Sequence, residues 1–124
     1  MGTVALKRIK NKSVNFLLTK IPLFNFKKSI ISYQNHLEEI KNNLSKYKNK
    51  LVDNGYMALM ISDQRYQGHY YARHADLIHI LKDTPLTLQG LINVIQDSNA
   101  LTAYGYPSTY VPNIINQFVI VLRK

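Results

Sequence analysis

The side chains best suited to ligand chemistry lie near the end of the chain, in an aromatic segment punctuated by proline. Residues 102–113 hold three tyrosines and two prolines, namely Tyr104, Tyr106, Tyr110, Pro107 and Pro112. Tyrosine rings offer flat faces on which a nucleobase can stack, and proline stiffens the backbone that carries them. Arg123 and Lys124 end the chain and suit a phosphate backbone. The segment therefore predicts a binding site for a nucleobase. The alternative is a loop that only covers the edge of a sheet.

Two further sets of polar side chains suggest a metal site or a ligand site. His69, His74 and His79 are five residues apart. On a helix each step of five turns the side chain by about 140°, so the three imidazoles do not converge, and we predict no metal site. Asp63 follows an apolar run, where an aspartate either orients a ligand at the carboxyl edge of a sheet or caps a helix.

The composition favours one small domain with a polyanionic partner. The chain has 124 residues, with 16 Lys and Arg against 7 Asp and Glu, which gives a formal net charge of +9. Such an excess favours nucleic acid or an anionic surface. The absence of cysteine excludes disulfides, thiolate zinc sites and cysteine nucleophiles. No apolar stretch is long enough to span a bilayer, and we expect a cytoplasmic protein without a membrane partner.

The first half of the chain predicts an arm, a strand, a helix and a second strand. Residues 1–12 form the basic arm, and residues 13–124 form the domain. Residues 14–19 predict a strand that Pro22 stops. After Ser29 or Ser32 as cap, apolar side chains recur at helical spacing from residue 30 to Leu51. Residues 53–55 predict a turn with Gly55 at positive φ, and residues 56–61 a strand buried on both faces.

The second half continues the alternation of strands and helices. Residues 62–71 predict a polar loop that includes Arg65 and Gly68, and the apolar spacing of residues 72–81 predicts a helix that ends before Pro85. Strands are expected at residues 86–96 and 117–122, separated by the long loop of residues 97–112. The order of elements predicts the α/β class.

These passages, in this order, resemble the DNA amino-methyltransferases that modify the exocyclic amine of adenine or cytosine. The segment Val14-Asn-Phe-Leu-Leu-Thr-Lys-Ile-Pro-Leu23 is similar to the strand that leads into the family's catalytic Asp/Ser/Asn-Pro-Pro-aromatic loop. Residues 33–40, 51–63, 70–78 and 104–124 resemble the segments that follow. The resemblance covers about residues 12 to 124 and implies a partial Rossmann-like methyltransferase sheet with flanking helices.

The resemblance also implies a catalytic loop, whose four positions fall on Lys20, Ile21, Pro22 and Leu23. In the family, the first residue and a neighbouring carbonyl accept hydrogen bonds from the target amine, and the aromatic residue stacks on the flipped base. Here the acceptor is a lysine, which has only donors, and the aromatic residue is a leucine. These departures argue against catalysis.

The cofactor of the family is S-adenosylmethionine, received by a Phe-x-Gly-x-Gly-like loop after a strand. The chain has five glycines, at positions 2, 55, 68, 90 and 105, and they are too scattered to form such a loop. We therefore expect the chain to resemble the target-base half without the cofactor half. It is not expected to bind S-adenosylmethionine alone.

Three functional hypotheses follow from these observations. The first is a truncated or degenerate DNA methyltransferase relative that is inactive alone and keeps nucleic-acid binding. Its DNA-binding residues would be Arg65, Tyr104, Tyr106, Tyr110, Arg123 and Lys124. The second is a subunit of a split methyltransferase whose protein partner, or a second copy, completes the enzyme. The third is a basic, non-enzymatic interaction protein that docks through an exposed half-sheet.

Overall fold

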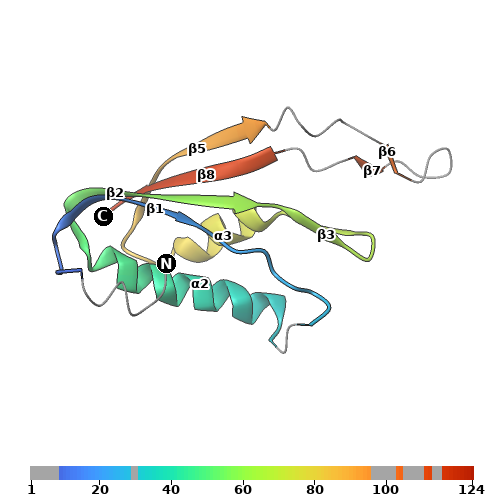
Figure 1. The fold of residues 1–124 in the computed structure, drawn as a ribbon, viewed down its shortest axis with the longest axis horizontal. Helices are drawn as coiled ribbons and strands as arrows, with labels where there is room; N and C mark the ends of the chain where they lie inside the picture. Colours follow the sequence, from blue (N-terminus) through green and yellow to red (C-terminus); the bar gives the residue numbers. More distant parts are fainter. Residues whose placement is uncertain (1–8, 29–30, 96–102, 105–110, 113–115) are drawn as a thin grey trace.

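The computed structural model describes residues 9–28, 31–95, 103–104, 111–112 and 116–124, and these form a mixed sheet with two helices (Figure 1). The sheet has the order β1-β2-β8-β5. Its strands are β1 (Val14–Lys20), β2 (Leu51–Ser62), β8 (Asn116–Arg123) and β5 (Thr87–Ile95). β1 and β2 are parallel, whereas β8 runs antiparallel to both of its neighbours. The α/β class predicted from the sequence is confirmed.

Helix α2 (Tyr33–Lys48) connects the two parallel strands. It begins at the predicted cap, where the Ser32 hydroxyl accepts a hydrogen bond from the Asn35 N–H at 3.1 Å. Its buried face carries Leu37, Ile40 and Leu44. The sequence-based expectation that the helix reaches Leu51 is wrong, because Leu51 is the first residue of β2 and is fully buried in the core.

Strand β2 is longer than predicted, since it includes the residues expected to form a turn. Asn54, and not Gly55, has positive φ (65°). Glycine is required at position 55 for a different reason: a Cβ there would lie 2.9 Å from the Val52 carbonyl oxygen. The adjacent pairing with β1 is irregular between Val14 and Phe16. The chain therefore bends locally without leaving the sheet.

The polar loop predicted for residues 62–71 is largely a hairpin. β3 (Gln64–Tyr66) pairs with β4 (His69–Tyr71) in antiparallel register. Gln67 and Gly68 both have positive φ, at 49° and 74°, which is the pattern of a type I′ turn. Type I′ turns favour Asn-Gly or Asp-Gly at these two positions. Here Gly68 fits that preference but Gln67 does not, so the sequence indicates the turn only weakly.

The remaining elements agree closely with the sequence. Helix α3 (Arg73–Leu81) ends before Pro85, and β5 and β8 occupy the predicted strand regions. Within the long segment of residues 97–112, β6 (Ala103–Tyr104) pairs with β7 (Val111–Pro112). The other residues of that segment lie outside the described part of the chain. Neither described helix is long and apolar enough to cross a membrane.

Both helices lie on the same side of the four-stranded sheet (Figure 1). The core lies between the helices and the sheet, and the strands contribute Leu17, Met57, Leu59, Ile120 and Leu122 to it. The expectation that β2 is buried on both faces holds only in part, because Ala58 on the second face is 4% exposed but its neighbour along the strand on that face is not buried. No described helix covers its second face, and Tyr56 on that face is 42% exposed.

Candidate functional site

The parallel strands β1 and β2 end side by side, and the loop after β1 is fixed to the end of β2 by Arg73. This arginine is the first residue of α3 and is fully buried. Its Nη1 donates to the Ser62 carbonyl oxygen at 3.0 Å, and its Nη2 donates to the Pro22 carbonyl oxygen at 2.7 Å. The guanidinium thus holds the predicted catalytic loop in place from inside the protein.

His36 completes the surroundings of this guanidinium. The Nη2 of Arg73 lies 3.5 Å from Nε2 of His36. Since arginine has only donors, a neutral His36 can accept from it only through Nε2, with the ring proton on Nδ1. Burial, followed by the positive charge of Arg73, lowers the pKa of His36 below its ordinary value. Burial also lowers the pKa of Arg73. A fully buried position is unusual for a guanidinium, because burial of a charge is costly unless the group is hydrogen-bonded.

Gln64 makes a second connection between the loop and the hairpin. The Phe24 N–H donates to Oε1 of Gln64 at 2.8 Å, and Nε2 of Gln64 donates to the Phe24 carbonyl oxygen at 2.9 Å. The side-chain amide therefore pairs with the backbone of the loop as a neighbouring strand would. These bonds position Phe24 in the core, where it is 7% exposed.

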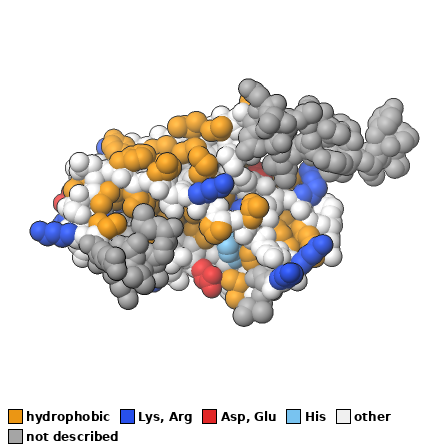
Figure 2. Space-filling view, viewed as in Figure 1, with side chains coloured by type: hydrophobic (Ala, Val, Ile, Leu, Met, Phe, Trp, Pro, Cys, Tyr) orange, Lys and Arg blue, Asp and Glu red, His pale blue; other side chains and the backbone are white. Residues whose placement is uncertain are grey.

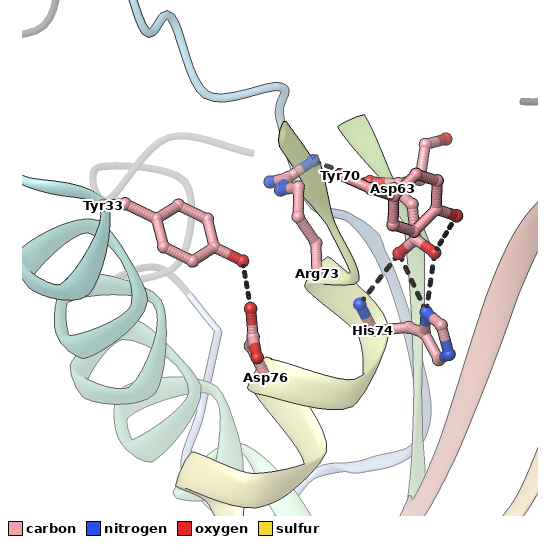
Figure 3. A network of polar contacts seen from close by, with 7 residues as sticks. Tyr33, Asp63, Tyr70, Arg73, His74 and Asp76 are labelled. Atoms are coloured by element: carbon pink, nitrogen blue, oxygen red, sulfur yellow. Dashed lines mark hydrogen bonds and ion pairs between the residues drawn. The ribbon is translucent and has the colours of Figure 1, made fainter. Parts of the chain in front are cut away.

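Asp63 is the centre of the polar network shown in Figure 3. Its carboxylate is buried and accepts from the Tyr70 hydroxyl at 2.7 Å, from the His74 N–H at 3.2 Å and from Nδ1 of His74 at 2.8 Å. Burial, followed by the hydrogen bond to Asp63, raises the pKa of Tyr70 to about 12. Because the bond to the His74 N–H lies in the first turn of α3, Asp63 caps this helix. The N-cap residue of α3 is Ala72, so Asp63 supports this helix end from outside the helix, and its role toward a ligand stays a prediction.

The histidines considered as metal ligands have separate environments. The ring of His74 stacks on Phe118 with centroids 3.7 Å apart, while His69 contacts Tyr71. His79 is exposed near the end of α3. Among the residues described, there is no group of three side chains that could hold a metal ion.

An aromatic cleft opens beside the loop. It has a volume of about 440 Å³ and is bounded by residues 23–27 of the loop and by residues 64–66 of β3. Phe26 stacks on Tyr66 with ring centroids 5.0 Å apart and an interplanar angle of 15°. Lys27 and Arg65 bring positive charge to the lining, and the Arg65 guanidinium also lies 5.1 Å from the centre of the Tyr70 ring. A flat, anionic ligand matches this combination of rings and cations.

The four predicted loop residues have different surroundings. Lys20 ends β1 and lines a second cavity of about 160 Å³ with His36 and Glu39 from α2. Ile21 is 6% exposed, and its N–H donates to the Met60 carbonyl oxygen at 2.8 Å. Leu23 is 68% exposed and lines the aromatic cleft. Leu23, the stacking position predicted from the resemblance, thus lines the aromatic cleft, whereas Lys20 lines a different cavity.

The predicted nucleic-acid residues do not form one group. Arg65 lies in β3, but Arg123 pairs with Tyr56 near the opposite end of β2. Lys124 is also engaged there, where its Nζ donates to the Leu51 carbonyl oxygen at 2.9 Å. Of the loop tyrosines, Tyr104 lies in β6, while Tyr106 and Tyr110 are outside the described residues. The terminal cations and the aromatic cleft are therefore at opposite ends of the sheet.

Sequence reasoning missed Arg73, Gln64 and His36. The contacts of Gln64 with Phe24, and of Arg73 with Pro22 and His36, join residues 37 to 51 positions apart, which no local pattern reveals. One signal was present: Arg73 opens a helix, where the helix dipole disfavours a cation. A cation at such a position suggests that a specific set of acceptors holds it.

Comparison with known proteins identifies the fold. No protein-family model and no curated protein matches the chain. Among solved structures, a protein described as a DNA modification methylase from Thermus thermophilus, complexed with S-adenosyl-L-methionine, aligns with a TM-score of 0.77 and 16% identity. The cytosine-N4-specific PvuII DNA methyltransferase aligns with a TM-score of 0.77 and 10% identity. The chain shares its fold with about half of each of these structures.

The chain is much shorter than the structures that it matches. The match to the Thermus protein covers 98% of this chain and 52% of that one, and the match to the PvuII enzyme covers 95% and 45%. The M1.HpyAVI complex with S-adenosylmethionine aligns with a TM-score of 0.54 and 14% identity over 97% of this chain and 47% of that one. The chain spans about half the length of each of these methyltransferase-fold structures.

The described residues do not fit S-adenosylmethionine through a glycine-rich loop. Gly55 lies inside β2, Gly68 lies in the turn between β3 and β4, and Gly90 lies inside β5. The connection from β1 to α2 contains no glycine. Within the described part of the chain, no glycine therefore lies in a loop that leads from a strand into a helix.

Proposed function

We propose that this chain is a DNA methyltransferase-like protein that binds nucleic acid and does not transfer methyl groups alone. The observation that carries the proposal is the aromatic cleft beside Leu23, at the loop position where the resembled enzymes stack the target base. Its volume of about 440 Å³ lies within the range of small-ligand pockets, about 300 to 1,000 Å³. Its rings would stack on an unpaired base, and its cations would attract the phosphates.

The chemistry of the loop supports the absence of methyl transfer. Lys20 supplies donors but no acceptor for a target amine, and Leu23 supplies no aromatic face. Ile21 replaces a proline, and its N–H is used in pairing with Met60. The loop is thus adapted to hold the sheet together, and Arg73 holds its backbone through Pro22.

The proposal is tested by restoring the stacking residue. Leu23→Tyr should strengthen binding of single-stranded DNA, because one base–aromatic stack contributes about 1 to 3 kcal/mol. Leu23→Met is the matched control and should bind as the unchanged chain does. Fluorescence anisotropy with single-stranded and duplex DNA is the measurement. If Leu23→Tyr gives no gain on single-stranded DNA, the cleft does not receive a base.

Methyl transfer is tested separately with tritiated S-adenosylmethionine and DNA. The unchanged chain should incorporate no label. Incorporation that disappears in Lys20→Ala would show that Lys20 is catalytic and that the inactive assignment is wrong.

A second candidate, a subunit of a split methyltransferase, is favoured by one specific observation. The chain spans about half of the matched structures, and one face of its sheet has no helical cover among the described residues. In that case S-adenosylmethionine would be bound by the partner half. Methyl transfer would then appear only when both polypeptides are present.

A further inference from the structure

Strand β5 forms one edge of the four-stranded sheet and is exposed along its whole length. It pairs with β8 on one side and has no second neighbour among the described strands (Figure 1). Every residue of the strand except Gly90 is exposed. Leu91 is 46% exposed, Ile92 is 53% exposed and Ile95 is 62% exposed. Figure 2 shows hydrophobic side chains gathered along the upper side of the molecule, where Figure 1 places β5 and β8.

The second half of β5 lacks the features that usually keep an edge strand from pairing. Such edges are commonly protected by charged side chains, by proline or by a bulge. From Thr87 to Ile95 the strand has neither proline nor a charged residue. Its register with β8 shifts between Leu88 and Gly90 and is regular from Gly90 onward. Residues 91–95 are therefore suited to pair with a further strand.

The partners on β8 show on which side of the sheet each side chain of this segment lies. Leu91 pairs with Ile120, which is fully buried in the core beneath the helices, so Leu91 lies on the helix side. Successive residues of a strand alternate between the two sides. The helix side therefore carries Leu91, Asn93 and Ile95, and the other side carries Ile92 and Val94.

The segment is self-complementary about Asn93. In a second, antiparallel copy related by a two-fold axis at Asn93, Val94 lies opposite Ile92, and Ile95 lies opposite Leu91. Opposed residues then share a side of the joined sheet, and each apolar residue meets another apolar residue. Asn93 meets its own copy, and its side-chain amide both donates and accepts hydrogen bonds. Moving the axis by one residue would place an apolar side chain opposite Asn93, so the sequence favours this register.

The charge distribution also fits a second copy as the occupant. Although the chain has a formal net charge of +9, the sequence from residue 84 to residue 122, which includes β5, contains no lysine or arginine. Arg123 pairs with Thr87, at the end of β5 away from the axis. Solvent ions screen charges that lie further apart than about 8 Å at physiological ionic strength. A nucleic acid or an acidic polypeptide would find no complementary charge at this edge, whereas two uncharged edges meet without repulsion.

We propose that two copies of this chain pair through β5, antiparallel and with the two-fold axis at Asn93, so that their sheets become continuous. A two-fold contact uses the same edge of both copies and therefore closes at the dimer. The proposal goes beyond nucleic-acid binding and does not depend on it, because the aromatic cleft is built from the loop after β1 and from β3. It is also independent of any polypeptide that supplies a cofactor site.

The absence of cysteine from the chain allows a direct test with single cysteines. Asn93→Cys should form an intermolecular disulfide under mild oxidation, because opposite residues of antiparallel strands have Cβ atoms about 4.5 to 5.5 Å apart. Ile92→Cys and Val94→Cys should each stay largely unlinked alone and should link to each other when the two variants are mixed before oxidation. Leu18→Cys, on the exposed part of β1, is the control and should not link.

Two results of this experiment would overturn the proposal. The first is linkage of Asn93→Cys no greater than that of Leu18→Cys, which would show that β5 does not meet its own copy. The second is linkage of Ile92→Cys alone to the same extent as its mixture with Val94→Cys, which would show a different register.

Sedimentation equilibrium measures the association itself, in the absence of nucleic acid. The unchanged chain should dimerise at micromolar concentrations, and Ile92→Lys should weaken the dimer roughly tenfold or more, because it places a charge opposite Val94 in each half of the contact. Leu18→Lys, at a position that is 57% exposed on β1, should leave the dimer unchanged. Both variants should melt as the unchanged chain does, since both positions are exposed. A monomer at these concentrations, open-ended polymers, or equal weakening by the two lysines would each contradict pairing through β5.

Discussion

The Arg73 guanidinium donates a hydrogen bond of 2.7 Å to the carbonyl oxygen of Pro22, a residue 51 positions earlier in the chain. This contact fixes the loop after β1 against the first turn of α3, and the bond to Ser62 adds the end of β2 to the same group. One buried side chain therefore connects the loop that lines the cleft with the end of β2 and the start of α3. Its loss should affect both stability and the shape of the cleft.

Replacing Arg73 with methionine should lower the free energy of unfolding by roughly 2 to 3 kcal/mol, because two buried carbonyl oxygens lose their donors. Arg123→Met is the matched control, and at this half-exposed position the change should stay within about 0.5 kcal/mol. Denaturant unfolding of both variants provides the comparison. Equal effects would show that Arg73 is not the connecting residue.

Stability should decrease as the pH falls below about 6.5, the ordinary pKa of histidine, and part of this decrease should come from His36. Its pKa is lowered in the folded protein, so the unfolded chain binds the proton more readily. The stabilisation is present above pH 6.5 and is lost as the pH falls through the folded-state pKa. His36→Gln keeps an acceptor for Arg73 and should show a shallower pH dependence in thermal melts. An unchanged dependence would contradict this assignment.

At alkaline pH the sign is opposite for Tyr70, whose folded-state pKa is raised to about 12. Its contribution is complete below pH 10, the ordinary pKa of tyrosine, and is lost as the pH rises from about 10 to 12. Ultraviolet absorbance should therefore show a tyrosinate that titrates near pH 12 and is absent in Tyr70→Phe. Tyr33 remains late in both proteins, because burial and its hydrogen bond to Asp76 raise its pKa further still. Tyr56→Phe, at an exposed position, should leave the late component in place. If Tyr56→Phe removed the late component instead, the assignment of that component to Tyr70 would be wrong.

Isothermal calorimetry should detect no binding of S-adenosylmethionine to the isolated chain at micromolar concentrations. The reason is the placement of the described glycines within β2, β5 and a hairpin turn. A one-to-one isotherm would reveal a cofactor site of a different construction. The outcome also separates the isolated chain from a two-polypeptide complex, in which binding is expected.

The sequence predicted the periodic and apolar elements well because their signals are local. Leu37, Ile40 and Leu44 recur at helical spacing, and residues 56–61 form an unbroken apolar run, so α2 and most of β2 were predictable. Asn54 and Gly55 suggested a turn, and the structure places them instead in an irregular stretch of β2: Leu51 pairs with Val14, and regular pairing with β1 and β8 begins at Tyr56. The hairpin of β3 and β4 was missed because Gln67 is a weak turn signal.

The site was predictable only in part. The loop from Lys20 to Leu23 was located by its sequence, and it does adjoin the aromatic cleft. The second wall of the cleft comes from Tyr66, and the connecting contacts come from Arg73 and Gln64, which all lie far along the chain from Leu23. Side chains brought together by long-range folding leave no spacing pattern, so this half of the site required the structure.

Salt-dependent binding of single-stranded DNA tests the central claim most directly. The logarithm of the binding constant should fall linearly with the logarithm of salt concentration, and Lys27→Gln at the cleft should reduce the slope by about 0.7, the value for one phosphate contact on a single strand. Lys82→Gln, at the far end of α3, should leave the slope unchanged. Binding that does not depend on salt, or no binding at low ionic strength, would contradict a nucleic-acid-binding role for this methyltransferase-like half.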